Sequence, residues 1–217
     1  TFVCPYHGWT YGLDGRLRGV PHEHGFPGLD KATSGLVPVK AVERHGVVFV
    51  TQDGDAEPDA ALPDDLLGPE WRVFSAGSQP IDANWKIVTE GVLEGYHIRA
   101  THAETFYPRQ YDNLNLVEPF GLRNTRVTYP YRNLERQRET APPERVTRPV
   151  LTHVYHLFPN AAVATFPTHR TLTVFEPLAP GRSTTVSYNL TDRADAPEAR
   201  AAVEKGKDFV GDGVDED

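Results

Sequence analysis

The sequence predicts an α+β fold, with short antiparallel strands on either side of one well-marked helix. Gly 18 and Pro 19 among 217 residues make up about 17% of the chain, against roughly 12% on average, which indicates many turns. Strand-like runs separated by turns lie at residues 71–79, 122–131, 152–158, 161–166, 169–175 and 183–191. Consecutive strands with short connections favour an antiparallel sheet.

The first part of the chain reads as a separate small β unit. Asp14-Gly15 is a hairpin signal, and Val47–Thr51 is a continuous apolar strand candidate. Residues 52–65 are acidic, contain proline and have few apolar side chains. We therefore expect one domain over 1–55, a surface linker over 56–70 and a second domain over 71–217.

The strongest helix candidate runs from Asn84 to His102. Asn84 is a suitable N-cap, and Trp85, Val88, Val92 and Tyr96 recur at spacings of three, four and four. The rest of this segment is also largely apolar or glycine, which predicts a helix buried on most sides. The charged stretch 132–148 interrupts the later strands and predicts an exposed excursion.

Composition excludes several classes of function. The formal net charge of −8 disfavours a nucleic-acid partner or an anionic membrane surface, both of which select basic faces. No apolar run reaches the roughly 18 residues of a membrane span. A single cysteine rules out an internal disulfide and predicts a cytoplasmic protein. The chain has no Met and starts at Thr1 within a motif, so we expect it to be an internal piece.

The first candidate site is the loop from Cys4 to Trp9. Cys4 and His7 can both point into one metal site, although such a pair also arises by chance. Pro5 and Gly8 favour a tight loop, and Trp9 is one of several aromatics around it. Apolar cover of this kind limits the solvent exposure of metal–sulfur clusters.

The second candidate site combines Glu90, Glu94, His97 and His102. At helical spacing, Glu90, Glu94 and His97 share one face, which could also be an ordinary solvated face. A buried carboxylate beside a histidine needs a cation or a proton. His102 lies about 140° around an ideal helix from His97, so both can bind one ion only if the helix bends or ends between them.

These residues resemble a known family. The segment CPYHGWTYGLDGRL is similar to the second half of a Rieske [2Fe–2S] motif, and NWKIVTEGVLEGYHIRATH is similar to the mononuclear-iron motif that follows it. Together they resemble the Rieske non-haem iron oxygenases, the α subunits of aromatic ring-hydroxylating dioxygenases. The resemblance implies the end of a β-rich Rieske domain, then a helix-grip catalytic domain with an antiparallel sheet.

The resemblance also implies roles for individual residues. Cys4 and His7 would be half of the cluster ligands, and Trp9 would shield the cluster. His97 and His102 would bind Fe(II), and Glu94 would connect His97 to a cluster histidine of a neighbouring subunit. The third iron ligand would be a late carboxylate, for which Asp217 is the candidate and Asp215 and Asp212 are alternatives. The role of Glu90 stays open, and the cluster ligand set is incomplete in this sequence.

The implied activity is hydroxylation of an aromatic or other small organic substrate with O2. Electrons would come from a ferredoxin or a reductase, and the implied assembly is a homotrimer, possibly with β subunits. One alternative is a ligand-binding module without catalysis, whose cavity would be lined by aromatic residues, namely Phe106, Tyr107, Phe158, Phe166 and Phe175. A pure electron carrier is a weaker alternative, because it has no use for about 150 residues after the cluster motif.

Overall fold

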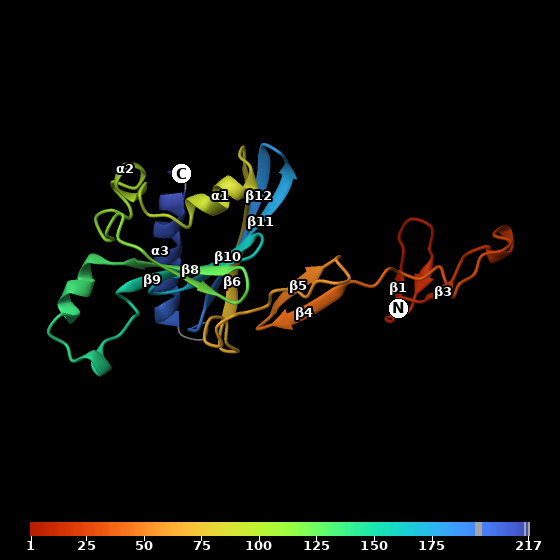
Figure 1. The fold of residues 1–217 in the computed structure, drawn as a ribbon, viewed down its shortest axis with the longest axis horizontal. Helices are drawn as coiled ribbons and strands as arrows, with labels where there is room; N and C mark the ends of the chain where they lie inside the picture. Colours follow the sequence, from red (N-terminus) through yellow and green to blue (C-terminus); the bar gives the residue numbers. More distant parts are fainter. Residues whose placement is uncertain (194–196, 215, 217) are drawn as a thin grey trace. The chain divides into compact units, whose positions relative to one another are not determined.

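The computed structural model describes residues 1–193, 197–214 and 216. The chain forms two compact units, Thr1–Pro58 and Asp59–Asp217. The segments of both units can be followed by colour in Figure 1. Each unit is described separately below.

The first unit consists of small antiparallel sheets. One has three strands and the other is a two-stranded ribbon. The strands are β1 (Phe2–Val3), β2 (Thr10–Tyr11), β3 (Leu17–Gly19), β4 (Lys40–Arg44) and β5 (Val47–Thr51). The turn between β2 and β3 contains the predicted Asp14-Gly15 pair, and Gly15 has a φ of 77°, a conformation that glycine adopts without strain.

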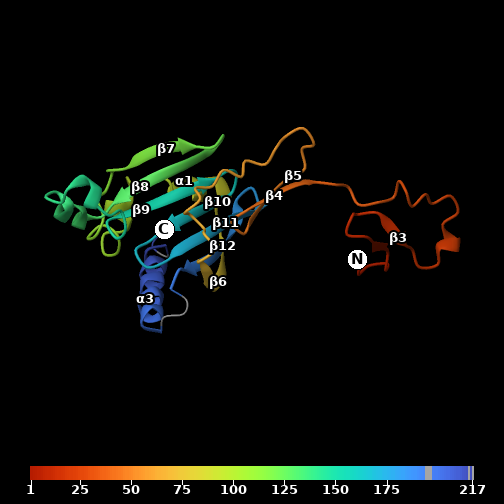
Figure 2. The same cartoon turned by 90° about the horizontal axis from the view of Figure 1, so that it is seen from below.

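The second unit is built on a seven-stranded antiparallel sheet with the order β6-β12-β11-β10-β9-β8-β7. Figure 2 shows these strands side by side from β7 at one edge to β6 at the other. The strands are β6 (Arg72–Ile81), β7 (Leu116–Phe120), β8 (Asn124–Pro130), β9 (Leu151–Leu157), β10 (Ala161–Thr165), β11 (Arg170–Ala179) and β12 (Arg182–Thr191). From β7 to β12 each strand pairs with the next, so the predicted α+β fold with an antiparallel sheet is confirmed.

The register of the strands gives this sheet two different faces. Val127 pairs with Val154 on one face, and Arg126 pairs with Tyr155 on the other, because directly opposed residues point to the same side. The Val127 face packs against Ile98 in an apolar cluster. We call it the histidine face, because Ile98 lies between His97 and His102.

The opposite face of the sheet is covered by the segment that leads into β6. The Asp65 carbonyl in this segment accepts a hydrogen bond from Arg170 of β11. Leu62, Leu66 and Leu67 are buried. Residues 56–70 therefore differ from the expected surface linker, because these leucines pack in the second unit and outweigh the acidic composition on which the expectation rested.

Three helices complete the second unit: α1 (Trp85–Gly91), α2 (Ile98–Thr101) and α3 (Pro197–Val214). Asn84 caps α1 as predicted, and its side chain accepts a hydrogen bond from the Lys86 N–H at 3.0 Å. The single helix expected over 84–102 is wrong, since the chain leaves helical geometry after Gly91. Burial on most sides is also wrong, because Ile87 is 65% exposed and Tyr96 is 79% exposed.

A close backbone contact accompanies the break between α1 and α2. A Cβ added to Gly95 would lie 2.6 Å from Oδ1 of Asn115, so a larger residue there would require the Asn115 side chain to move. The later excursion 132–148 contains two short 3₁₀ turns, Arg132–Gln137 and Pro142–Glu144. Within the described parts of the chain, no helix is both long enough and apolar enough to cross a membrane.

Candidate metal centre

His97 and His102 lie at the two ends of the one-turn helix α2. Their Nε2 atoms are 3.2 Å apart, although the residues are five positions apart in sequence. Two nitrogens that each lie about 2.0–2.1 Å from one metal ion are about 2.9–3.4 Å from each other. Because α2 is only one turn long and ends at His102, the two rings lie in a geometry that fits a single ion.

Glu94 holds the ring of His97 from the segment between α1 and α2. Its Oε1 accepts a hydrogen bond from His97 Nδ1, and its Oε2 accepts from the N–H of Tyr96. Partial burial raises the pKa of Glu94, but the hydrogen bonds from His97 and Tyr96 outweigh it, so the pKa lies below its usual value. Glu94 is therefore a carboxylate that fixes the orientation of His97.

Glu216 holds the ring of His102 from the far end of the chain. Its Oε2 lies 2.9 Å from His102 Nδ1 and 2.6 Å from Thr105 Oγ1. The Thr105 hydroxyl and the His102 ring lower the pKa of Glu216. Sequence reasoning treated Glu216 only as the neighbour of Asp217, since no local pattern connects it to a histidine 114 positions earlier.

The two carboxylates determine which ring nitrogens are available to a metal. An ionised carboxylate only accepts hydrogen bonds, so the Nδ1 atom of each ring carries the proton. In neutral rings the lone pairs are then on the two Nε2 atoms, which approach each other. Histidines whose Nδ1 is supported by a carboxylate in this way commonly bind metal ions through Nε2.

The structure leaves the third ligand undetermined. Asp217 and Asp215 lie outside the described residues, and Asp212 is exposed on α3. Among the residues that the structure does describe, no group of three His, Cys, Asp or Glu side chains could hold a metal. Glu90 is exposed on α1, away from the buried His102.

In the first unit, Cys4 and Trp9 close a tight loop. The Cys4 N–H donates to the Trp9 carbonyl at 2.8 Å, and the Gly8 N–H donates to the Cys4 carbonyl at 2.9 Å. Gly8 has a φ of 72°, which suits glycine at this turn. The His7 ring is exposed and lies 3.7 Å from the Tyr6 ring, centroid to centroid. The loop supplies one Cys and one His, half of a Rieske ligand set.

Two family models match this chain. Residues 68–217 match the family described as the ring hydroxylating alpha subunit, catalytic domain. The chain belongs to this family. Residues 1–33 match the Rieske [2Fe–2S] domain, so the order of the two domains is the order that the motifs predicted.

Relatives of this ring-hydroxylating α subunit act on different substrates according to their names. This chain is 34% identical over 139 residues to the glycine betaine monooxygenase oxygenase subunit of Chromohalobacter salexigens. The match covers 61% of this chain and 29% of the relative. It is 36% identical over 121 residues to the naphthalene 1,2-dioxygenase large oxygenase component of Pseudomonas putida, covering 48% of this chain and 26% of the relative. The chain thus spans less than a third of these relatives.

Solved structures share the fold of this α subunit. A quaternary ammonium Rieske monooxygenase aligns with a TM-score of 0.70 at 17% identity, covering 98% of this chain and 60% of the other. Naphthalene 1,2-dioxygenase from a Rhodococcus species aligns with a TM-score of 0.66 at 22% identity. The alignment covers 96% of this chain and 57% of the other.

A cavity of about 730 Å³ lies between α3 and the turn from β10 to β11 of this α subunit. Phe166, His169 and Phe209 are among its lining residues. Phe209 contacts the ring of Phe106 at 5.6 Å between centroids, and Phe106 contacts His102 at 4.8 Å. A line of aromatic rings therefore connects the cavity to the histidine pair.

The other aromatics considered for a binding cavity lie elsewhere. Tyr107 packs with the apolar cluster of the histidine face. Phe175 is 2% exposed and belongs to the core. Phe158 is 39% exposed, and its ring lies 4.5 Å below the guanidinium of Arg123.

Proposed function

We propose that this chain carries the catalytic part of a Rieske-type non-haem iron oxygenase that hydroxylates an aromatic or other small organic substrate with O2. The observation that carries the proposal is the pair of facing Nε2 atoms, 3.2 Å apart, with a carboxylate on each Nδ1. A plain binding module has no use for two imidazoles oriented in this way.

His97 and His102 would hold the mononuclear Fe(II), with Asp217 as the proposed third ligand. Two histidines and one carboxylate leave coordination positions open. Cys4 and His7 would contribute half of the ligands of the [2Fe–2S] cluster, with Trp9 beside it. When bound, the iron would supply dioxygen activation and the cluster would supply electrons.

The role of the surrounding side chains follows from their contacts. Glu94 keeps the proton of His97 on Nδ1, so that Nε2 faces the ion. The Glu94 side chain is 47% exposed, and each carboxylate oxygen can accept more than one hydrogen bond. It is therefore able to accept a further bond from a cluster histidine of a neighbouring subunit, which is the proposed electron route.

We assign the substrate to the cavity beside α3. Phe166 and Phe209 provide apolar walls, and the rings of Phe209 and Phe106 lead toward His102. The proposed partners are a ferredoxin or reductase as electron donor and further copies of the chain in a homotrimer, possibly with β subunits. A cytoplasmic location is proposed because the chain has a single cysteine and therefore no internal disulfide.

Iron loading of the full-length protein tests the proposal. His97→Ala and His102→Ala should each remove the mononuclear iron and abolish product formation, and the Rieske EPR signal should persist. His156→Ala is the matched control, because among the described residues its ring hydrogen-bonds only to the Pro159 carbonyl, at 3.2 Å. Full iron content in both site variants would contradict the proposal.

Glu94→Gln separates metal binding from electron transfer. Neither metal centre loses a ligand, so iron content and cluster reduction should stay close to wild type, whereas product formation should fall steeply because the connecting carboxylate is gone. Product at the wild-type rate would show that Glu94 is not the connection.

A further inference from the structure

A second, smaller cavity lies on the sheet face opposite the histidine face. Its volume is about 250 Å³, and its wall contains the arginines Arg126, Arg148 and Arg170 and one carboxylate residue, Asp65. Arg126 pairs with Tyr155, so its side chain points away from Val127 and the histidine face. Three cations around so small a space would repel one another unless anions balance them.

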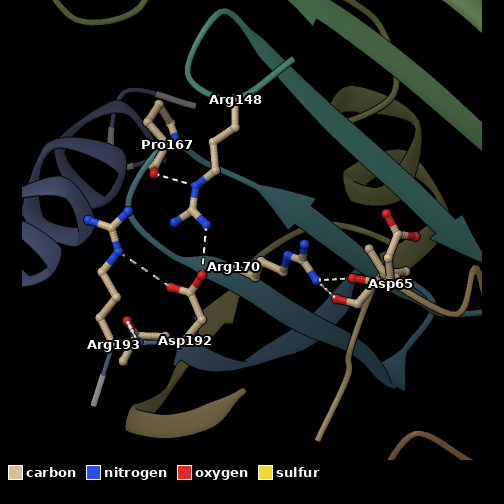
Figure 3. Close-up of polar contacts among 8 residues, drawn as sticks. Asp65, Arg148, Pro167, Arg170, Asp192 and Arg193 are labelled. Atoms are coloured by element: carbon tan, nitrogen blue, oxygen red, sulfur yellow. Dashed lines mark hydrogen bonds and ion pairs between the residues drawn. The ribbon is translucent and has the colours of Figure 1, made fainter. Parts of the chain in front are cut away.

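Two of these arginines already have carboxylate partners. Arg126 Nη2 lies 2.5 Å from Glu118 Oε2. Arg148 Nη1 donates to Asp192 Oδ2 at 2.9 Å, and its Nε donates to the Pro167 carbonyl at 2.6 Å. Figure 3 shows this pair together with Arg193, which approaches the same Asp192.

Arg170 differs from the other two arginines. Its Nη1 donates to the main-chain carbonyls of Asp65 and Leu66, which Figure 3 shows at the edge of the covering segment. Its guanidinium lies 3.9 Å from the centre of the Trp71 ring. These contacts fix the plane of the group, and the described residues form no ion pair with it.

The remaining donors of Arg170 are available to a ligand. Within the described part of the chain, Nε and Nη2 of Arg170 make no hydrogen bond. Neither atom is fully buried, so both are accessible from the cavity. Burial lowers the pKa of Arg170, although the carboxylates of Asp65 and Asp192 act in the opposite direction. A guanidinium presents two parallel N–H groups that match a carboxylate or a phosphate.

We propose that this cavity binds a small oxyanion, a carboxylate or a phosphate, on the free edge of Arg170, in a wall that also contains Arg126 and Arg148. The hydroxyl-bearing residues Tyr155 and Thr165 also line the space. Its volume is below the roughly 300–1,000 Å³ of pockets for drug-sized ligands, which limits the ligand to a small ion. The site does not depend on the proposed oxygenase function.

Trp71 provides a local reporter for the test. The full-length protein is titrated with acetate and, separately, with inorganic phosphate at constant ionic strength, and tryptophan emission is recorded. A saturable change is expected that disappears in Trp71→Phe. A response to acetate alone identifies a carboxylate site, and a response to phosphate alone identifies a phosphate site. No saturable response to either ion overturns the proposal.

Substitutions then assign the binding to Arg170. Arg170→Gln should raise the dissociation constant at least about tenfold, because a charge-assisted hydrogen bond is lost. Arg193→Gln is the matched control, since it removes the same charge beside Asp192 but outside the cavity wall. An equal loss of binding in Arg193→Gln would contradict the proposal.

A second variant covers the case in which Arg170→Gln disturbs the segment at Asp65 and Leu66. Arg170→Lys keeps the charge and a donor for the main-chain carbonyls but lacks the planar fork, and its fold is checked by circular dichroism. It should bind several-fold more weakly than wild type. Wild-type affinity in a folded Arg170→Lys protein would show that the guanidinium does not hold the anion.

Discussion

At the residue scale, the two histidines obtain their orientation from carboxylates that are very differently placed. Glu94 is three positions from His97, whereas Glu216 is 114 positions from His102. His102 is also 1% exposed, so its ring is held on all sides. A local contact thus orients the more accessible ring, and a long-range contact orients the buried one.

This arrangement predicts that Glu216 controls iron affinity. Carboxylates that support a metal-bound histidine change affinity by about 10–100-fold, and Glu216→Ala should lose a factor in this range. Glu216→Gln keeps an acceptor for His102 Nδ1 and should lose less. Competition with a chelator measures the affinity, and Glu204→Ala, which removes only the exposed contact with Arg200, is the control. Unchanged affinity in Glu216→Ala would contradict the prediction.

His169 predicts a pH dependence of stability. Burial, helped by Arg148 and Lys207, lowers its pKa to about 4, whereas the unfolded chain protonates near 6.5. Between these values the unfolded state binds the extra proton, so stability falls as the pH drops from about 6.5 to about 4. The loss from this group should reach about 2 kcal/mol by pH 5.

Denaturant unfolding at pH 7 and pH 5 measures this loss. His169→Leu lacks the titrating ring and should lose correspondingly less stability between the two pH values. His24→Gln removes an exposed histidine and should leave the wild-type pH dependence intact. The same pH dependence in wild type and His169→Leu would rule out His169 as its source.

At the scale of elements, the sheet was predictable and the helices were only partly so. The strand expected over 161–166 is Ala161–Thr165, since turn dipeptides marked its ends. Asn84 marked the start of α1, whereas no capping signal in the sequence marked its end at Gly91. The helix α3 was missed because its glycines and acidic end resemble a solvated tail.

The residues of the candidate site were likewise only partly predictable from the sequence. Glu94, His97 and His102 are close in sequence, so their spacing identified them before the geometry was known. Glu216 reaches His102 only because α3 packs beside Phe106. No periodicity in the sequence contains that information.

The packing of α3 predicts opposite effects for two neighbouring glycines. A Cβ at Gly213 would lie 2.5 Å from Cζ of Phe106, whereas a Cβ at Gly211 would meet nothing within 4 Å. Gly211→Ala should therefore stabilise the helix by up to about 1 kcal/mol, and Gly213→Ala should displace α3 from Phe106 and lower both melting temperature and iron affinity. Equal melting temperatures and iron affinities for the two variants would contradict this packing.

At the scale of the whole molecule, the two proposed metal sites belong to separate compact units. Cys4 lies within Thr1–Pro58, and His97 and His102 lie within Asp59–Asp217. We therefore expect the centres to load independently. In the full-length protein, Cys4→Ser should abolish the Rieske EPR signal of the reduced protein and leave the mononuclear iron in place.

Tyr6→Phe is the control for this experiment, because it changes an exposed neighbour in the same loop and keeps the thiol. A Rieske signal of wild-type intensity in Cys4→Ser would show that Cys4 is not a ligand. Loss of both centres would show that the units do not load separately.

The distance along the chain between His102 and Glu216 also sets an order in time during synthesis. A ribosome adds roughly 5–20 residues per second, so the 114 residues that separate them take roughly 6–23 s to be made. During that interval the nascent chain contains both imidazoles but not the carboxylate that orients His102. We therefore expect high-affinity binding of the proposed iron only after α3 has been translated and Glu216 has reached His102.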